Sequence, residues 1–140
     1  MMISTKGRYA LRVMLDICEN GKDGCVSLSD VAKRQEISPK YLEAIVARLC
    51  RAGLIESRRG KSGGYRLSKP AEEYNLLEII EATEGGLVPV NCACITEDGR
   101  CEKSGLCPTA PVWKKLDEII CDYLRGVTLC ELLEKPTEKS

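Results

Sequence analysis

Two short helical segments and a glycine-rich basic segment follow one another in the first half of the chain. Ser27, with Asp30 three residues later, is a capping-box-like start for the first helix, and Ser38 followed by Pro39 suits the start of the second. Gly53 is a suitable residue to end that second helix. Its face for burial is formed by apolar residues at helical spacing, namely Leu42, Ile45, Val46 and Leu49. We therefore expect a helix-turn-helix of about 8 and 14 residues.

The hydrophobic period changes from helix to strand directly after this pair. Residues 54–57 and 65–67 are typical of short strands, and residues 58–64 between them are rich in glycine and cations. A longer amphipathic helix is expected ahead of the pair, over residues 4–20. Helix-turn-helix followed by a basic hairpin is the order of a winged helix-turn-helix domain. The expected fold class is mainly α with a small β-hairpin wing.

The second half of the chain is expected to end in a long helix over residues 109–126. Its apolar stripe has the spacing of a coiled-coil seam, with Val112, Leu116, Ile119/Ile120 and Tyr123, continued by Val127. We divide the chain into a winged helix-turn-helix domain at 1–70, a connecting helix and cysteine-rich loop at 71–108, and the long helix with its tail at 109–140.

The net charge of zero conceals a division between the two halves. Residues 1–70 hold 14 Lys or Arg against 7 Asp or Glu, and residues 71–140 hold 7 against 14. A basic half joined to an acidic half indicates that the first half meets a polyanion. The alternative is two oppositely charged halves with no nucleic acid involved.

Two segments of the basic half are candidates for DNA contact. The first turn of the second short helix can present side chains to base edges in a major groove, with Ser38, Pro39, Lys40, Tyr41 and Glu43. A carboxylate there accepts hydrogen bonds from the cytosine amino group and is repelled by phosphate, so Glu43 would improve discrimination at some cost in affinity. The wing adds Arg58, Arg59 and Lys61, with Gly63 among the glycines that permit close approach to a duplex. An ordinary solvent-facing glutamate and a flexible charged hairpin are the alternatives.

Composition excludes or disfavours several other functions. The chain has no histidine, so Ser–His and Cys–His nucleophile pairs are excluded within it. Phe is absent, which disfavours base-stacking platforms for single strands. A thiol-dependent redox enzyme is disfavoured because no C-x-x-C pair occurs, and we expect no enzymatic activity. No apolar run approaches the roughly 20 residues of a membrane-spanning helix, so we expect a cytoplasmic protein with no membrane partner.

The cysteines are the outlying feature of the composition. There are nine, without a secretory signal, which favours thiolate chemistry over a disulfide framework. Cys92, Cys94, Cys101 and Cys107 fall within 16 residues of an irregular segment. Three or four thiols in such a loop suit a [2Fe–2S] or [4Fe–4S] cluster or zinc, and a thiol switch is a further alternative.

Several motifs together resemble one known family over nearly the whole chain. They are STKGRYALR at 4–12, ISPKYLE at 37–43, AGLI at 52–55, Arg59-Gly60 and Gly63-Gly64-Tyr65 in the wing, and Val112-Trp113. The chain is similar in these motifs to the small bacterial winged helix-turn-helix regulators that include IscR, NsrR and CymR, the Rrf-type transcriptional regulators.

The resemblance implies a mode of DNA binding. In this family the second helix of the motif reads the major groove of a palindromic operator, and the wing, with Arg59 as its reader, enters the minor groove. The proteins are homodimers through the long C-terminal helix. In IscR-like members the glutamate that matches Glu43 separates two classes of operator according to cluster occupancy.

The resemblance also implies a ligand set of Cys92, Cys101 and Cys107, with Cys94 in reserve, for an iron–sulfur cluster. We favour [2Fe–2S], with [4Fe–4S] as the alternative. The gap of eight residues between Cys92 and Cys101 departs from the five typical of cluster-binding members. Ala110 stands where IscR-like proteins carry a histidine and Arg8 where NsrR-like proteins carry an aspartate, so the fourth ligand stays open.

The expected function is therefore a DNA-binding transcriptional regulator, a repressor, that senses iron–sulfur, redox or nitrosative status through a cysteine-ligated cluster. The alternative is a cluster-free regulator of cysteine or sulfur metabolism that acts through a protein partner such as cysteine synthase, as CymR-like relatives do.

Overall fold

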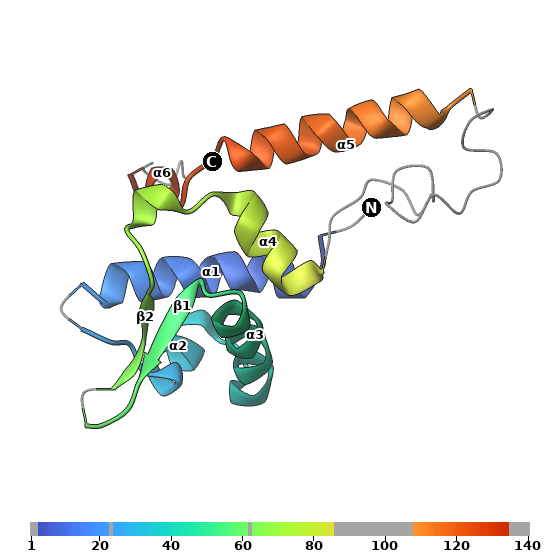
Figure 1. Ribbon diagram of the computed structural model, residues 1–140. Coiled ribbons are helices and arrows are strands. Elements are labelled where there is room, and N and C mark those ends of the chain that lie inside the picture. Colours follow the sequence, from blue (N-terminus) through green and yellow to red (C-terminus); the bar gives the residue numbers. More distant parts are fainter. Residues whose placement is uncertain (1–2, 23, 62, 86–107, 135–140) are drawn as a thin grey trace, which may run out of the picture.

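Helices dominate the computed structural model, which describes residues 3–22, 24–61, 63–85 and 108–134 (Figure 1). The elements in chain order are α1 (Thr5–Asn20), α2 (Leu28–Gln35), α3 (Pro39–Arg51), β1 (Ile55–Arg58), β2 (Gly64–Leu67), the short 3-10 helix η1 (Ala71–Glu73), α4 (Leu76–Glu84), α5 (Ala110–Arg125) and α6 (Leu129–Glu134). The described part of the chain thus has the predicted helix-turn-helix, hairpin and long C-terminal helix, in the predicted order.

The helices begin where the sequence places capping side chains. The hydroxyl of Ser38 accepts a hydrogen bond from the backbone N–H of Tyr41 at 3.3 Å, and Ser27 accepts in the same way from Asp30 at 3.2 Å. Each bond satisfies one of the N–H groups that a helix start leaves unpaired. The C-terminal end of α3 is set by Gly53, whose φ of 75° is a left-handed conformation that glycine adopts without strain.

The hairpin is extended by a third segment that the sequence did not indicate. β1 and β2 pair antiparallel, with Ile55 opposite Leu67. Val26 then forms an isolated bridge with Tyr65, because each backbone N–H donates to the other residue's carbonyl at 2.8 Å. Gly64 beside this bridge has a φ of 145°, and a Cβ there would collide with the Val26 carbonyl. The wing is therefore fixed to the segment ahead of α2.

Two apolar clusters meet at α4. The larger cluster joins α1, α2 and α3 to β1 and to single residues of later elements, and its fully buried members include Val13, Met14, Leu42, Ile45, Leu49, Tyr74, Ile79 and Leu129. The smaller cluster joins Leu76, Leu77 and Ile80 of α4 to Leu124 of α5. In Figure 1, α4 accordingly lies between α1 and α5. α4 is thus the element through which α5 is attached to the rest of the fold.

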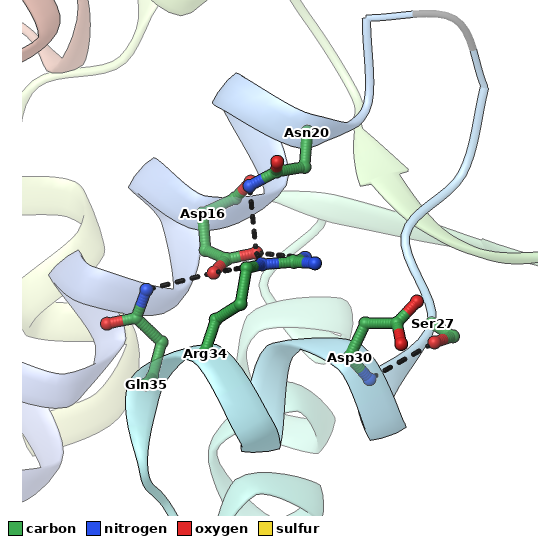
Figure 2. Close-up of polar contacts among 6 residues, drawn as sticks. All are labelled: Asp16, Asn20, Ser27, Asp30, Arg34 and Gln35. Atoms are coloured by element: carbon green, nitrogen blue, oxygen red, sulfur yellow. Dashed lines mark hydrogen bonds and ion pairs between the residues drawn. The ribbon is translucent and has the colours of Figure 1, made fainter.

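A buried carboxylate ties α1 to α2 (Figure 2). Asp16 is 3% exposed and accepts hydrogen bonds from the Arg34 guanidinium, the shortest at 2.7 Å, and from the Gln35 amide at 2.9 Å. Burial by itself raises the pKa of Asp16, but the hydrogen bonds from Arg34 and Gln35 and the charge of Arg34 outweigh it and hold the pKa below its usual range. The ionised carboxylate therefore stabilises the angle between the two helices.

We expect Asp16→Asn to lower the free energy of unfolding by about 2 kcal/mol near neutral pH, because the amide cannot accept all of these hydrogen bonds. The side chain of Arg34 is 39% exposed, which keeps the effect at the lower end of the range for charged groups. The native pKa of Asp16 is depressed, so its contribution is present above about pH 4 and is lost as the pH falls through that lowered value. Urea denaturation of wild type and variant should therefore converge in acid.

The matched control is Asp30→Asn, which changes an exposed aspartate on α2. It should shift stability by only a few tenths of a kcal/mol. Equal losses for the two variants would contradict the role assigned to Asp16.

Candidate nucleic-acid interface

One face of α3 is open to solvent. Leu42, Ile45, Val46 and Leu49 are buried as the sequence predicted. Residues on the opposite side of the helix are exposed, and they include Lys40, Glu43, Ala44, Ala47 and Arg51. Ser38 and Pro39 at the start of the helix are exposed as well. The exposed face thus carries a cation near each end, a carboxylate between them and two alanines that allow close approach.

Tyr41 differs from the other residues of this first turn because it is half-buried. Its ring packs edge-on against Tyr9 of α1, with the ring centroids 5.9 Å apart. Arg12 lies over the Tyr9 ring at 5.1 Å and donates a hydrogen bond to the Gln35 carbonyl at 2.8 Å. Tyr41 therefore holds α3 against α1.

Pro39 and Glu43 also line a groove between α2 and α3. The groove has a volume of about 510 Å³, and its wall on α2 is formed by Leu28 and Ala32. Glu43 stands on the rim of this mostly apolar surface. Its carboxylate has no hydrogen bond or ion pair among the described residues, so it is available to an external donor.

The wing presents cations at its tip. Arg58, Arg59 and Lys61 are all exposed, and Gly63 donates its N–H to the Gly60 carbonyl at 3.0 Å to close the turn. Arg66 further down the wing behaves differently, because its guanidinium forms an ion pair with Glu56 on the opposite strand at 3.0 Å. The unneutralised charge of the wing is therefore concentrated at the tip.

A buried tyrosine that sequence reasoning missed anchors the base of the wing. Tyr74 is fully buried, and its hydroxyl donates to the Leu54 carbonyl at 2.6 Å. The same hydroxyl accepts hydrogen bonds from the backbone N–H groups of Ser68 at 2.9 Å and Lys69 at 3.2 Å. One side chain thereby joins the start of β1 to the segment after β2. The pattern of the sequence gave no signal for this contact, since it joins segments without a shared period.

The apolar stripe predicted for the C-terminal helix divides between two faces of α5. Val112, Leu116, Ile119 and Tyr123 are 56%, 38%, 54% and 69% exposed. Ile120, in contrast, is half-buried and packs on the smaller cluster of α4, as does Val127 after the helix. The exposed residues recur at intervals of four, three and four along α5, so they form one continuous unpartnered stripe.

The clustered cysteines Cys92, Cys94, Cys101 and Cys107 lie outside the described residues. The cysteines that the structure does describe are half-buried, and burial raises the pKa of the Cys18, Cys50 and Cys121 thiols. Thiols with a raised pKa are poor metal ligands at neutral pH. Within the described ranges, no group of three His, Cys, Asp or Glu could hold a metal ion, and no helix is both long and apolar enough to cross a membrane.

This arrangement matches known proteins along nearly the entire chain. Residues 3–135 match the Rrf2 family, described as an iron-dependent transcriptional regulator. The chain belongs to the Rrf2 family.

Individual relatives agree with this assignment. A Neisseria meningitidis protein assigned as a helix-turn-helix-type transcriptional regulator is 42% identical over 135 residues, which are 96% of this chain and 89% of that protein. The structure of CymR, the global cysteine regulator of B. subtilis, is 32% identical with a TM-score of 0.76, covering 94% of this chain and 95% of that one. The structure of IscR from T. potens is 33% identical with a TM-score of 0.77, covering 96% and 87%.

The matches confirm the predicted family and the winged helix-turn-helix fold class with its C-terminal helix. Rrf2 proteins are DNA-binding transcriptional regulators, and this chain is therefore a regulator of that kind and not an enzyme.

Proposed function

We propose that this Rrf2 regulator is a repressor that reads a palindromic operator through the exposed face of α3 and the tip of the wing. The observation that supports this proposal is the concentration of unneutralised cations on one continuous region of the basic half. Lys40 on α3 and Arg58, Arg59 and Lys61 on the wing are all exposed and lack an ion pair among the described residues. Because chromosomal DNA is the target, the proposed place of action is the cytoplasm.

Each part of this region has a distinct proposed role. Ser38, Pro39, Lys40 and Tyr41 place the first turn of α3 in the major groove, with Tyr41 fixing the helix and Lys40 reaching a guanine edge or a phosphate. Glu43 accepts from a cytosine amino group and repels sites that lack one. Arg59 enters the minor groove, while Arg58 and Lys61 pair with phosphates and Gly63 allows the backbone to come close.

Replacement of these residues should separate affinity from selectivity. Arg59→Ala should weaken binding to the operator and lower the dependence of log Kd on log salt concentration by about 1, since about one phosphate contact is lost. Glu43→Ala should instead narrow the difference in affinity between the operator and unrelated duplexes, because a repulsive element is removed. Fluorescence anisotropy over a series of salt concentrations measures both effects.

Arg66→Ala is the matched control in the same wing, because the charge of Arg66 is already neutralised by Glu56. Its effect on the salt dependence should be clearly smaller than that of Arg59→Ala. Equal effects would reject the assignment of Arg59. An absence of wild-type binding to any duplex at low ionic strength would reject the proposed DNA interface as a whole.

The exposed stripe of α5 is proposed to bind a second copy of this chain. Val112, Leu116, Ile119 and Tyr123 cover three turns of the helix, and exposed apolar stripes of this continuity mark interaction surfaces. A two-fold symmetric protein matches the two halves of a palindromic operator, and an isologous pairing of α5 helices supplies that symmetry.

Ile119→Glu should convert the dimer to a monomer, because it places a charge at the centre of the stripe. Affinity for a two-half-site duplex should then fall by about 100-fold or more, since the half-sites are no longer bound together. Analytical ultracentrifugation gives the mass. The neighbouring exposed change Glu118→Gln should leave the dimer intact, and a dimeric Ile119→Glu chain would contradict the proposal.

The proposed signal is an iron–sulfur cluster held by Cys92, Cys101 and Cys107, with Cys94 in reserve. The donor set fits such a group, because cysteine thiolates are its usual ligands and the chain has no histidine to compete. When bound, the cluster supplies a centre that oxidants or nitric oxide modify. The description of the family as iron-dependent and the similarity to an IscR structure support the proposal.

Anaerobic reconstitution with iron and sulfide should give a thiolate-to-iron absorption band and change operator affinity about 5- to 150-fold, the usual range of allosteric coupling. Replacing Cys92, Cys101 and Cys107 together by serine should remove the band, whereas Cys25→Ser should retain it. A band that survives the triple replacement would reject the ligand assignment.

The cluster-free alternative is favoured by a separate observation, which is the similarity to CymR over 94% of the chain. A wild-type chain that binds operator but takes up neither iron nor sulfide would support it. Binding of cysteine synthase would then be the proposed means of regulation.

A further inference from the structure

Arg48 is the one cation in the middle of α3, but its guanidinium is not directed to a free surface. Its Nη1 donates a hydrogen bond to the backbone carbonyl of Thr83 at 3.1 Å. Thr83 lies in the last turn of α4, where carbonyl groups have no partner within the helix and carry partial negative charge. The bond therefore satisfies a carbonyl at the end of α4 and attaches α3 to that end.

The acceptor is held firmly in place. Thr83 is 1% exposed, and its hydroxyl donates back to the Ile80 carbonyl at 3.1 Å. The next residue, Glu84, caps the other neighbouring helix, because one of its carboxylate oxygens accepts from the Ser4 N–H at 2.9 Å and from the Gly7 N–H at 3.0 Å. A Cβ at Gly7 would lie 2.7 Å from that oxygen. The last turn of α4 thus grips α3 through one residue and α1 through the next.

The opposite face of α4 carries α5. Leu76, Leu77 and Ile80 pack with Leu124, while the stripe around Ile119 faces away from the body (Figure 1). Between the proposed pairing surface on α5 and the proposed reading surface on α3, α4 is therefore the connecting element. In a dimer, the separation of the two α3 helices depends on how rigidly α3 is joined to α4.

We propose that Arg48 is a positioning residue that sets the half-site separation of the operator. It does so through its bond to Thr83, without contacting DNA itself. The inference rests on the proposed function, because it needs a dimer that binds two half-sites. Since half-site separation on a duplex is set by the geometry of the protein, a looser joint should accept several separations.

The test is a selection from a pool of duplexes with a random central region, using wild type and Arg48→Ala and sequencing the bound fraction. Wild type should enrich one separation between half-sites. Arg48→Ala should enrich the same half-site sequence at two or more separations, and its affinity for the wild-type separation should fall about fivefold or more. A residue that only stabilises the fold would lower the yield without widening the distribution.

Arg51→Ala is the matched control, since Arg51 is exposed on the same helix without an ion pair among the described residues. It should keep the single separation and weaken binding in a salt-dependent way. If thermal unfolding shows that Arg48→Ala does not fold, Arg48→Lys keeps the charge and the stem but loses the planar donor group, and it should widen the distribution too.

A single separation with Arg48→Ala or Arg48→Lys would overturn the proposal, and a changed half-site sequence would show that Arg48 contacts bases. Failure of the wild type to enrich any duplex would instead reject the proposed DNA interface and leave the joint between α3 and α4 as a structural feature only.

Discussion

Burial of one face of α1 is the interaction on which the other contacts depend. Ala10, Val13, Met14 and Ile17 are at most 1% exposed, and α2, α3, α4, β2 and α6 all pack against this helix. Burying a large apolar side chain contributes about 1.5–3 kcal/mol, so this face supplies much of the driving force for folding. Specific polar contacts at both ends of α1, with Glu84 at its start and Asp16 near its end, then fix the direction of the helix.

With its interior face turned to α1, α3 can leave its other face to solvent. The same division recurs in α5, where one side packs on α4 and the other exposes four large apolar residues. Two exposed surfaces of opposite character therefore sit on one scaffold, a charged one on α3 and the wing and an apolar one on α5. This separation allows one surface to contact nucleic acid while the other contacts protein.

Features with local signals were predictable from the sequence. The caps at Ser27 and Ser38 and the glycine that ends α3 act within four residues along the chain, and the structure confirms all three. The buried stripe of α3 was predictable for the same reason, because its period is fixed by helix geometry.

Contacts between distant segments were not predictable in this way. The hydroxyl of Tyr74 reaches Leu54 across 20 residues, and Arg48 reaches Thr83 across 35. No periodic pattern marks such partners, since each depends on how whole elements pack. The stripe of α5 shows the same limit, because spacing alone did not separate Ile120, which packs inward, from its exposed neighbour Ile119. The roles of Glu43, Arg59 and the clustered cysteines remain predictions.

The cap on α1 has a consequence for the order in which the chain can fold during synthesis. The Glu84 carboxylate that completes the start of α1 is made 80 residues after Ser4. A nascent chain that has emerged only as far as the wing therefore lacks this cap as well as Tyr74 and Ile79 of the core. The N-terminal helix is the first element translated and among the last to be completed, so chaperone-accessible intermediates should persist until α4 has left the ribosome.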